Sequence, residues 1–456
     1  MKCSIFWASL AVEYVTMGYA TARNGLAGNY IENPSPQPIV LHEPVHEKTT
    51  PAVDADPLTL DWALDAAIKH HPSLAATWYA IKSRQGAVRQ AGLLPNPILF
   101  GEMEEFGGTG NFSGTGAMTS RIGISQDFSL GGKIAKRVHE AEAAAAIAEL
   151  EHQAKILEIR ALVERRFLDV LIFQERLDFE AQQLALIEKT HDVVDKRVNT
   201  GDTSPLDLSR SQVELAWAKI AIGQTRMELE ATLYALAESW GANSPDFSAV
   251  CAQYHTDLDL TKQELKEALP QSPAWLLLEK QVAMADATLD LAEAQRIVDI
   301  ELEGGIQLFN ESDDHAYFIG ISVPLPLFDR NQGGVAEAKA SQQKMHYERK
   351  AGFLALHTEL QKTWRKLTST QQAFQSLDSE VLPASQRAFE SISKAYKAGE
   401  VGILDLLNAQ RTWVETRNTR LDLLYDLENN RIEIKRLVGA GVATAPTSYA
   451  GNNSSN

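Results

Sequence analysis

The stretch TGDTSPLDLSRSQ, from Thr200 to Gln212, recurs later in the chain as AGEVGILDLLNAQ, from Ala398 to Gln410. Aligned without gaps, both segments read small-Gly-acid, three variable residues, Leu-Asp-Leu, three more residues and Gln. The two glycines are 198 positions apart. The same turn, with the same aspartate behind it, therefore occurs twice, which indicates that the chain contains a duplicated unit.

Two further markers support the duplication. The tetrapeptide IGIS at 122–125 recurs at 319–322, an offset of 197, and the pair Gly131-Gly132 recurs as Gly333-Gly334. Three markers in the same order, near one offset, are unlike a chance similarity. The chain is therefore read as two copies of one unit.

Each copy contains the same predicted parts. The first repeat spans 58–240, with helical patterns at 58–90, 133–200 and 204–240 and two strand-like segments within about 97–128. The second spans 263–438, with helices at 263–296, 333–398 and 402–438 and strands within about 298–327. The segment 133–200 has no Gly or Pro and predicts one helix of roughly 100 Å. Pro383 is expected to kink its counterpart.

The predicted strands alternate with period two. In VDIELEGGIQLF (298–309), one face carries Val298, Ile300, Leu302, Ile306 and Leu308, and the other carries Asp299, Glu301, Glu303 and Gln307. The segment that begins at Pro97 alternates poorly. Strands of about 10 residues match those of outer-membrane barrels, although a half-buried soluble hairpin gives the same pattern.

Three constraints favour a membrane barrel shared between chains. Four strands cannot close a barrel, because the smallest known type has about eight. An open sheet in lipid would leave unpaired backbone groups at its edges. A helical section of roughly 100 Å is too long to be the packing partner of such strands. We therefore expect a mainly α chain with a transmembrane β part. Two chains would supply eight strands and three would supply twelve, and the larger barrel leaves a water-filled lumen.

The remaining segments are read from composition. Lys2, the apolar run 4–12 and Ala20-Thr21-Ala22 predict a signal peptide over 1–22, cut after Ala22. Residues 23–57 predict an extended linker, 241–262 a connector and 439–456 a disordered tail.

Composition and motifs argue against several other functions. The net charge of −17 argues against nucleic-acid binding. Cys3 and Cys251 form no disulfide framework, and His42, His46 and the pair His70-His71 lack further ligands at metal-site spacing. The glycine-rich segments at 107–116 and 130–133 lack the Gly-Lys-Ser/Thr of a phosphate loop. We expect no enzyme activity, resident metal or cofactor.

The chain resembles the TolC-type outer-membrane factors over about 58–438, and most of all their CzcC-like branch, which is associated with heavy-metal efflux. The residues that carry the resemblance are GLLPNPILFGEMEEFGGTG (92–110), ISQDFSLGGKIAKR (124–137) and VPLPLFDRNQGG (323–334). The chain departs from the branch at Ser129-Leu130, where an acid-Leu pair is usual, and at Lys133-Ile134, where the branch has Lys-Arg.

The resemblance implies a homotrimer with a 12-stranded barrel in the outer membrane of a Gram-negative bacterium, continued by a periplasmic α-helical barrel. Such a channel is a passive exit duct that works with a periplasmic adaptor (membrane fusion) protein and an inner-membrane RND-type pump. The branch suggests heavy-metal cations as cargo. The alternatives are a duct for drugs or other small molecules and, from a different class, a periplasmic adaptor or a coiled-coil scaffold.

The resemblance also assigns roles to residues of the repeated turn. The adaptor-contacting tips are Thr200-Gly201-Asp202 and Ala398-Gly399-Glu400. The pore constriction is Asp405 with Asn408. The closed state is braced by Asp207, with Arg197, Tyr396 or Arg210 as substitutes for an arginine that some relatives carry. Substitutes are needed because Val401 stands where some relatives carry an arginine. The plainer alternative for Asp207 and Asp405 is a first-turn acid that the helix dipole favours.

Overall fold

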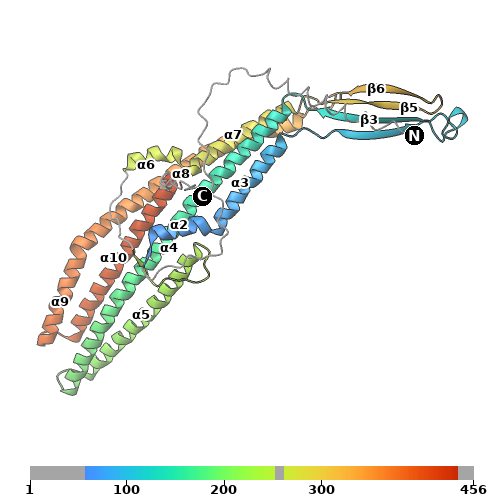
Figure 1. Ribbon diagram of the computed structural model, residues 1–456. Coiled ribbons are helices and arrows are strands. Elements are labelled where there is room, and N and C mark those ends of the chain that lie inside the picture. The colour runs from blue at the N-terminus through green and yellow to red at the C-terminus, as the bar shows by residue number, and fades with distance from the viewer. Residues whose placement is uncertain (1–56, 252–260, 440–456) are drawn as a thin grey trace, which may run out of the picture. The chain divides into compact units, whose positions relative to one another are not determined.

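The computed structural model describes residues 57–251 and 261–439 (Figure 1). The expected signal peptide, His42, His46, nearly all of the expected linker and tail, and part of the expected connector lie outside the described residues. Of the helices within these ranges, none has both the length and the apolar character needed to cross a membrane.

The described residues contain two similar series of elements. The first is β1 (Leu58–Thr59), α2 (Leu60–His70), α3 (Pro72–Ala91), β2 (Ile98–Glu104), the 3₁₀ turn η1 (Gly110–Phe112), β3 (Thr119–Phe128), α4 (Lys133–Asn199) and α5 (Pro205–Glu238). The second is β4 (Val250–Cys251), α6 (Lys262–Ala268), the 3₁₀ turn η2 (Leu269–Gln271), α7 (Pro273–Ala294), β5 (Ile300–Phe309), β6 (Asp314–Ser322), α8 (Gln332–Ser376), the π-helical turn η3 (Leu377–Val381), α9 (Leu382–Ala398) and α10 (Ile403–Val438).

Two helices expected to be continuous are broken by proline. The segment 58–90 forms α2 and α3, because Pro72 opens α3 and His71 has an extended conformation. The His71 imidazole caps α3 by accepting a hydrogen bond from the Ser73 N–H at 3.1 Å. The segment 263–296 is likewise divided, with Pro273 opening α7. Proline has no N–H for the helical ladder but fits the first helical turn, so both breaks follow from ordinary proline chemistry.

The long helix α4 is the element around which the others are arranged. It has 67 residues, which corresponds to about 100 Å. The helices α3 and α5 both pack on it, α3 toward the strands and α5 from the turn at Gly201 (Figure 1). In the second repeat α7 and α10 pack on α8 and α9. The helix expected over 333–398, for which Pro383 predicts a kink, is divided into α8 and α9 by the π-helical turn η3 directly before Pro383.

The four longer strands form one antiparallel sheet in the order β2-β3-β5-β6. The two repeats are joined at its centre, where β3 pairs with β5. Within the described chain, β2 and β6 each have one neighbour and one unpaired edge. A lone four-stranded sheet therefore leaves two edges for other strands to join.

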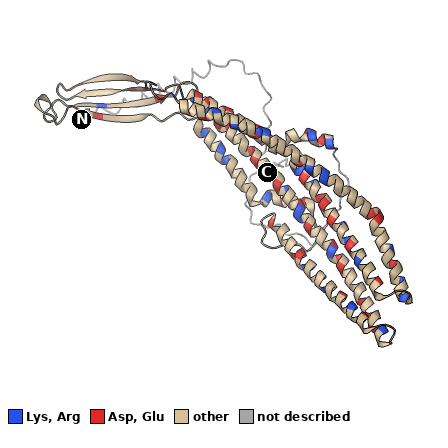
Figure 2. Ribbon diagram, turned by 180° about the vertical axis from the view of Figure 1, so that it is seen from behind, with Lys and Arg blue, Asp and Glu red and all other residues tan. Residues whose placement is uncertain are grey.

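The two faces of this sheet differ completely in charge. The register puts all seven charged residues of the four strands on one face, namely Glu102, Glu104, Arg121, Asp127, Glu301, Glu303 and Asp314. The opposite face carries Leu99, Met103, Ile122, Ile124, Leu302, Ile306, Leu308, Tyr317, Ile319 and Ile321, which are 40% to 88% exposed in the single chain. The helices, in contrast, carry charges of both signs along their length (Figure 2).

The poor alternation expected for β2 has a structural explanation. Leu99 and Met103 lie on the apolar face, as strict alternation requires, but Ile98 and Phe100 lie on the charged face. The ring of Phe100 covers Gly123, where an added Cβ would lie 2.6 Å from the ring. The aromatic residue fills the space above a glycine of the next strand, so its position follows from packing rather than from periodicity.

Candidate functional site

The turns after α4 and after α9 have the same backbone geometry. Gly201 and Gly399 have φ of +83° and +79°. After each glycine, the N–H of Asp202 or Glu400 donates to the carbonyl oxygen five positions back, at 2.7 Å and 2.9 Å respectively. Such helix ends favour glycine, because other residues are strained at positive φ. The two predicted tips are therefore equivalent turns of the two repeats.

The helices that leave the two turns begin differently. Ser204 caps α5 by accepting a hydrogen bond from the Leu206 N–H at 3.2 Å. The equivalent position before α10 is Gly402, which has no side chain. There the carboxylate of Asp405 accepts a hydrogen bond from the Gly402 N–H at 3.3 Å. Asp405 thus stabilises the start of its own helix, whatever else it does.

Asp405 and Asn408 lie on the exposed side of the first turns of α10. Their neighbours Ile403 and Leu406 are buried in the core at the tip. The spacing of three puts the aspartate and the asparagine on one helix face. A single chain therefore presents both predicted constriction residues together and leaves both free of the core.

The predicted bracing residues divide into two pairs. Arg197 Nη1 donates to the backbone oxygen of Tyr396 at 3.2 Å, and its guanidinium lies 5.3 Å from the centre of the Tyr396 ring. This contact joins the end of α4 to the end of α9. Asp207 instead accepts hydrogen bonds from Thr203 at 2.8 Å and Arg210 at 3.2 Å, both near the start of α5. Of the predicted substitutes, Arg197 connects the two hairpins, whereas Arg210 pairs locally.

Tyr396 is almost fully buried, with 5% exposure. Burial raises the pKa of the Tyr396 hydroxyl, the Arg197 charge opposes this rise, and the negative charge of Asp207 adds to it. The hydroxyl oxygen is buried and has no hydrogen-bond partner within the described chain. Val401, at the position of the missing arginine, packs against the same core.

A hydrophobic core holds together the two helical hairpins that meet at the repeated turns, α4 with α5 and α9 with α10. Val194, Phe389, Tyr396, Ile403 and Leu406 form a buried cluster that includes α4, α9 and α10. Next to it, the ring of Trp413 stacks on Phe389 at 5.1 Å and meets Phe179 edge-on at 5.6 Å. Three helices from both repeats therefore share one core near the repeated turn.

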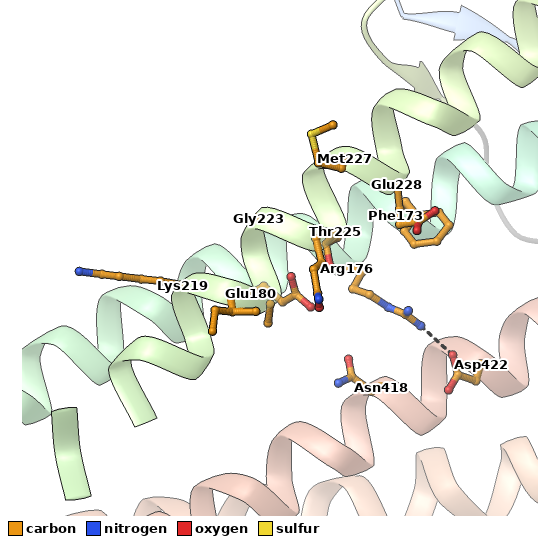
Figure 3. Close-up of a pocket in the computed structure, with 13 residues that line it drawn as sticks. Phe173, Arg176, Glu180, Lys219, Gly223, Thr225, Met227, Glu228, Asn418 and Asp422 are labelled. Atoms are coloured by element: carbon orange, nitrogen blue, oxygen red, sulfur yellow. Dashed lines mark hydrogen bonds and ion pairs between the residues drawn. The ribbon is translucent and has the colours of Figure 1, made fainter. Parts of the chain in front are cut away.

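The helices α5 and α10 are separated by a groove with α4 as its floor (Figure 3). The groove has a volume of about 860 Å³. Arg176 of α4 reaches across to Asp422 of α10, with 2.7 Å between the paired atoms (Figure 3). Nearer the tip, Arg411 of α10 pairs with Glu214 of α5 at 2.6 Å. Sequence reasoning missed both pairs, because residues 246 and 197 positions apart share no local pattern.

The other candidate residues serve local structure. His71 caps α3, as described above, and Cys251 is exposed in β4, so it is a connector residue rather than a core residue. Residues 107–116 form the loop between β2 and β3. Across 57–251 and 261–439, no three His, Cys, Asp or Glu side chains lie close enough together to hold a metal ion.

The chain is similar to outer-membrane efflux proteins along most of its length. The sequence pattern of the outer membrane efflux protein family matches residues 63–242 and 265–440. The chain is 30% identical to the cobalt-zinc-cadmium resistance protein CzcC of Cupriavidus metallidurans over 402 residues, which cover 85% of this chain and 92% of CzcC. It is 25% identical to the cation efflux system protein CusC of Escherichia coli K12, covering 73% of this chain and 75% of CusC.

Solved structures show the same fold. A crystal structure of CusC has a TM-score of 0.73 at 19% identity, covering 91% of this chain and all of that one. The outer membrane protein VceC of Vibrio cholerae has a TM-score of 0.71 at 20% identity, covering 83% and 96%. These likenesses confirm the mainly α fold with a β part that the duplicated sequence predicts.

Proposed function

The chain belongs to the outer membrane efflux protein family, and from this premise we propose that it is a passive exit duct for heavy-metal cations. Its place is the outer membrane, with a large periplasmic part. The observation that carries the proposal is the sheet, in which one face holds all seven charges and the other holds none. An apolar face suits lipid and a charged face suits a water-filled lumen.

We propose that three copies assemble. The unpaired edges of β2 and β6 support this, because only closure removes lipid-exposed strand edges, and three four-stranded sheets give twelve strands. The helix α5 supplies a second argument. It exposes apolar side chains with spacings of seven, four, three, seven and seven, which are Leu206, Val213, Trp217, Ile220, Met227 and Tyr234. This heptad seam suits a helix of a second copy.

The proposed cargo rests on charge. Six of the seven charged residues on the polar face of the sheet are acidic, and the exposed Asp405 would add an acidic ring in a trimer. Carboxylates that line a pore favour cations. The names of CzcC and CusC, a cobalt-zinc-cadmium resistance protein and a cation efflux protein, support the same cargo.

The proposed partners are a periplasmic adaptor protein, which would meet the turns at Gly201 and Gly399, and an inner-membrane pump of the RND type. Asp405 with Asn408 would narrow the mouth, and the contact between Arg197 and Tyr396 would hold it closed. The pump supplies the energy, so the duct needs no catalytic group. It lowers the barrier to export by offering a path through water.

Two experiments test this proposal. Membrane fractionation of the full chain should yield a trimer in the outer membrane that requires detergent, and a monomer in the soluble periplasmic fraction would contradict the duct. Deletion of the gene should increase sensitivity to Zn, Co, Cd, Cu or Ni salts, and expression of the full chain should restore growth. Sensitivity to antibiotics alone would contradict the metal cargo but not the duct.

A further inference from the structure

Arg121 is the only basic residue among the seven charged residues on the polar face of the sheet. It lies in β3, directly opposite Glu102 of β2. Its Nη1 atom is 3.3 Å from a carboxylate oxygen of Glu102, and its Nη2 atom is 3.7 Å from one of Glu303 in β5. One guanidinium therefore bridges two carboxylates on the strands to either side of its own.

The guanidinium is also held flat against the sheet. Its central carbon lies 4.2 Å from the centre of the Phe318 ring in β6, a cation–π contact. To reach Phe318 it crosses β5 beside Gly305, the residue that pairs with Phe318. The side chain is 26% exposed. Arg121 is thus fixed along the surface of the sheet rather than extended away from it.

Glycines make room for this arrangement. Gly123 and Gly305 pair across β3 and β5, and a Cβ on Gly305 would overlap the carbonyl of Ile122. The ring of Phe100 lies over Gly123, with its centre 6.1 Å from that of Phe318. In the middle of the polar face, the two phenylalanine rings and the Arg121 guanidinium therefore lie over glycines, which leave space for them.

We propose that this group, the Arg121 clamp (Arg121 with Glu102, Glu303 and Phe318), sets the cation selectivity of the β part of the duct. The inference rests on the proposed function, in which the polar face lines the lumen. Each chain then contributes two negative charges and one positive charge at this height. A conducting pore must attract its ion strongly enough to admit it and weakly enough to release it. Arg121 offsets half of the acidic charge and so keeps divalent cations from being retained.

Removing the positive charge of the clamp and removing one of its negative charges should change cation selectivity in opposite directions. Arg121→Gln leaves both carboxylates without their counter-charge, so attraction for cations increases. Glu303→Gln removes one carboxylate and leaves Arg121 balanced by Glu102, so attraction decreases. Arg121→Lys keeps the charge and should preserve selectivity. If the arginine served only to join the strands, these substitutions would alter stability without moving selectivity in opposite directions.

Planar bilayers containing the full-length protein provide the test, with reversal potentials measured across a KCl gradient at low ionic strength. We expect Arg121→Gln to raise the K⁺ to Cl⁻ permeability ratio at least about twofold and to lower the Zn²⁺ concentration that blocks the current, because local charge governs both. Glu303→Gln should lower the ratio. Arg84→Gln, which removes an exposed arginine of α3, is the matched control and should leave the ratio unchanged.

The outcomes separate the clamp from the duct. Channels whose permeability ratio is the same in the wild type, Arg121→Gln and Glu303→Gln would overturn the clamp and leave the duct intact. A shift in the same direction for both variants would also overturn it. A wild-type protein that forms no channel would overturn the proposed function itself, and the clamp with it.

Discussion

The guanidinium of Arg197, near the end of α4, donates a hydrogen bond to the backbone oxygen of Tyr396, near the end of α9. The two residues are 199 positions apart, and each stands a few residues before the glycine of its own repeat. The contact therefore joins the two equivalent turns of one chain. It also puts an arginine beside the second turn, although Val401 occupies the position where some relatives carry one.

Loss of this contact should favour an open mouth. Arg197→Ala removes a charged donor whose hydrogen bond is worth about 1.5 kcal/mol, so the open population should increase roughly tenfold. Single-channel recordings in planar bilayers measure this as more frequent or larger openings. Lys196→Ala is the control, because Lys196 is the adjacent exposed cation. Equal openings in both variants would remove Arg197 from the brace.

The hydroxyl of Tyr396 should be dispensable, whereas its ring should not. The hydroxyl has no partner in the described structure, so Tyr396→Phe removes an unpaired polar atom and should leave stability unchanged or slightly improved. Tyr396→Ala removes a buried ring and should cost about 3 kcal/mol. Thermal unfolding in detergent measures both changes. A Phe variant as unstable as the Ala variant would show that the hydroxyl has a partner.

Unfolding at alkaline pH provides a second measurement of the Tyr396→Phe variant. Burial raises the pKa of Tyr396 above its ordinary value of 10.0, so the folded state favours the neutral phenol. The corresponding stability is present below pH 10 and is lost as the pH rises through the folded-state pKa. Tyr396→Phe should therefore move the alkaline unfolding midpoint upward. Tyr425→Phe is the comparison, because burial raises the pKa of the Tyr425 hydroxyl to about 12 and the negative charge of Asp169 adds to that rise, so this variant should also move the alkaline unfolding midpoint upward.

The turn at Gly399 has room for a side chain, but its backbone conformation is one that residues other than glycine rarely adopt. A Cβ there would lie 3.6 Å from Arg197 Nη2, an ordinary contact, but φ is +79°. Gly399→Val should therefore cost at least about 1–2 kcal/mol, and Gly399→Asn clearly less, because asparagine adopts positive φ more readily. Thermal unfolding measures the cost, and binding of purified adaptor measures the coupling. If the Asn variant lost as much stability as the Val variant, backbone strain would not be the cause.

Periodicity predicts most of the fold, and the repeated Gly-acid motif predicts the positions of the two turns. The 67-residue α4 lies within the segment that lacks Gly and Pro, and the alternation in 298–309 correctly separates the two faces of β5. Both patterns are local, so the sequence displays them directly. The breaks at Pro72 and Pro273 were also visible as prolines, but the helical pattern continues across them and hides the change of element.

Contacts between distant residues could not be read in this way. Phe100 lies on the polar face because Gly123 of another strand leaves room for its ring. Arg411 meets Glu214, and Arg197 meets Tyr396, only because two hairpins pack together. Packing decides these contacts, and packing has no local signal.

Asp405 carries two separable roles, which a pair of substitutions can distinguish. Its carboxylate accepts a hydrogen bond from the Gly402 N–H, and its exposed charge is the proposed source of the acidic ring. Asp405→Asn keeps an oxygen that can cap the helix but removes the charge. Asp405→Ala removes the capping oxygen as well as the charge, so it should also lower the free energy of unfolding by about 1 kcal/mol.

The two variants should therefore behave alike in conduction and differently in stability. In planar bilayers both should raise single-channel conductance and weaken block by multivalent cations, because the ring loses its charge. In thermal unfolding only the alanine variant should melt clearly below the wild type. If block and conductance followed stability instead, so that Asp405→Asn conducted like the wild type, the carboxylate would be a helix cap and the constriction would have to be sought elsewhere at the mouth.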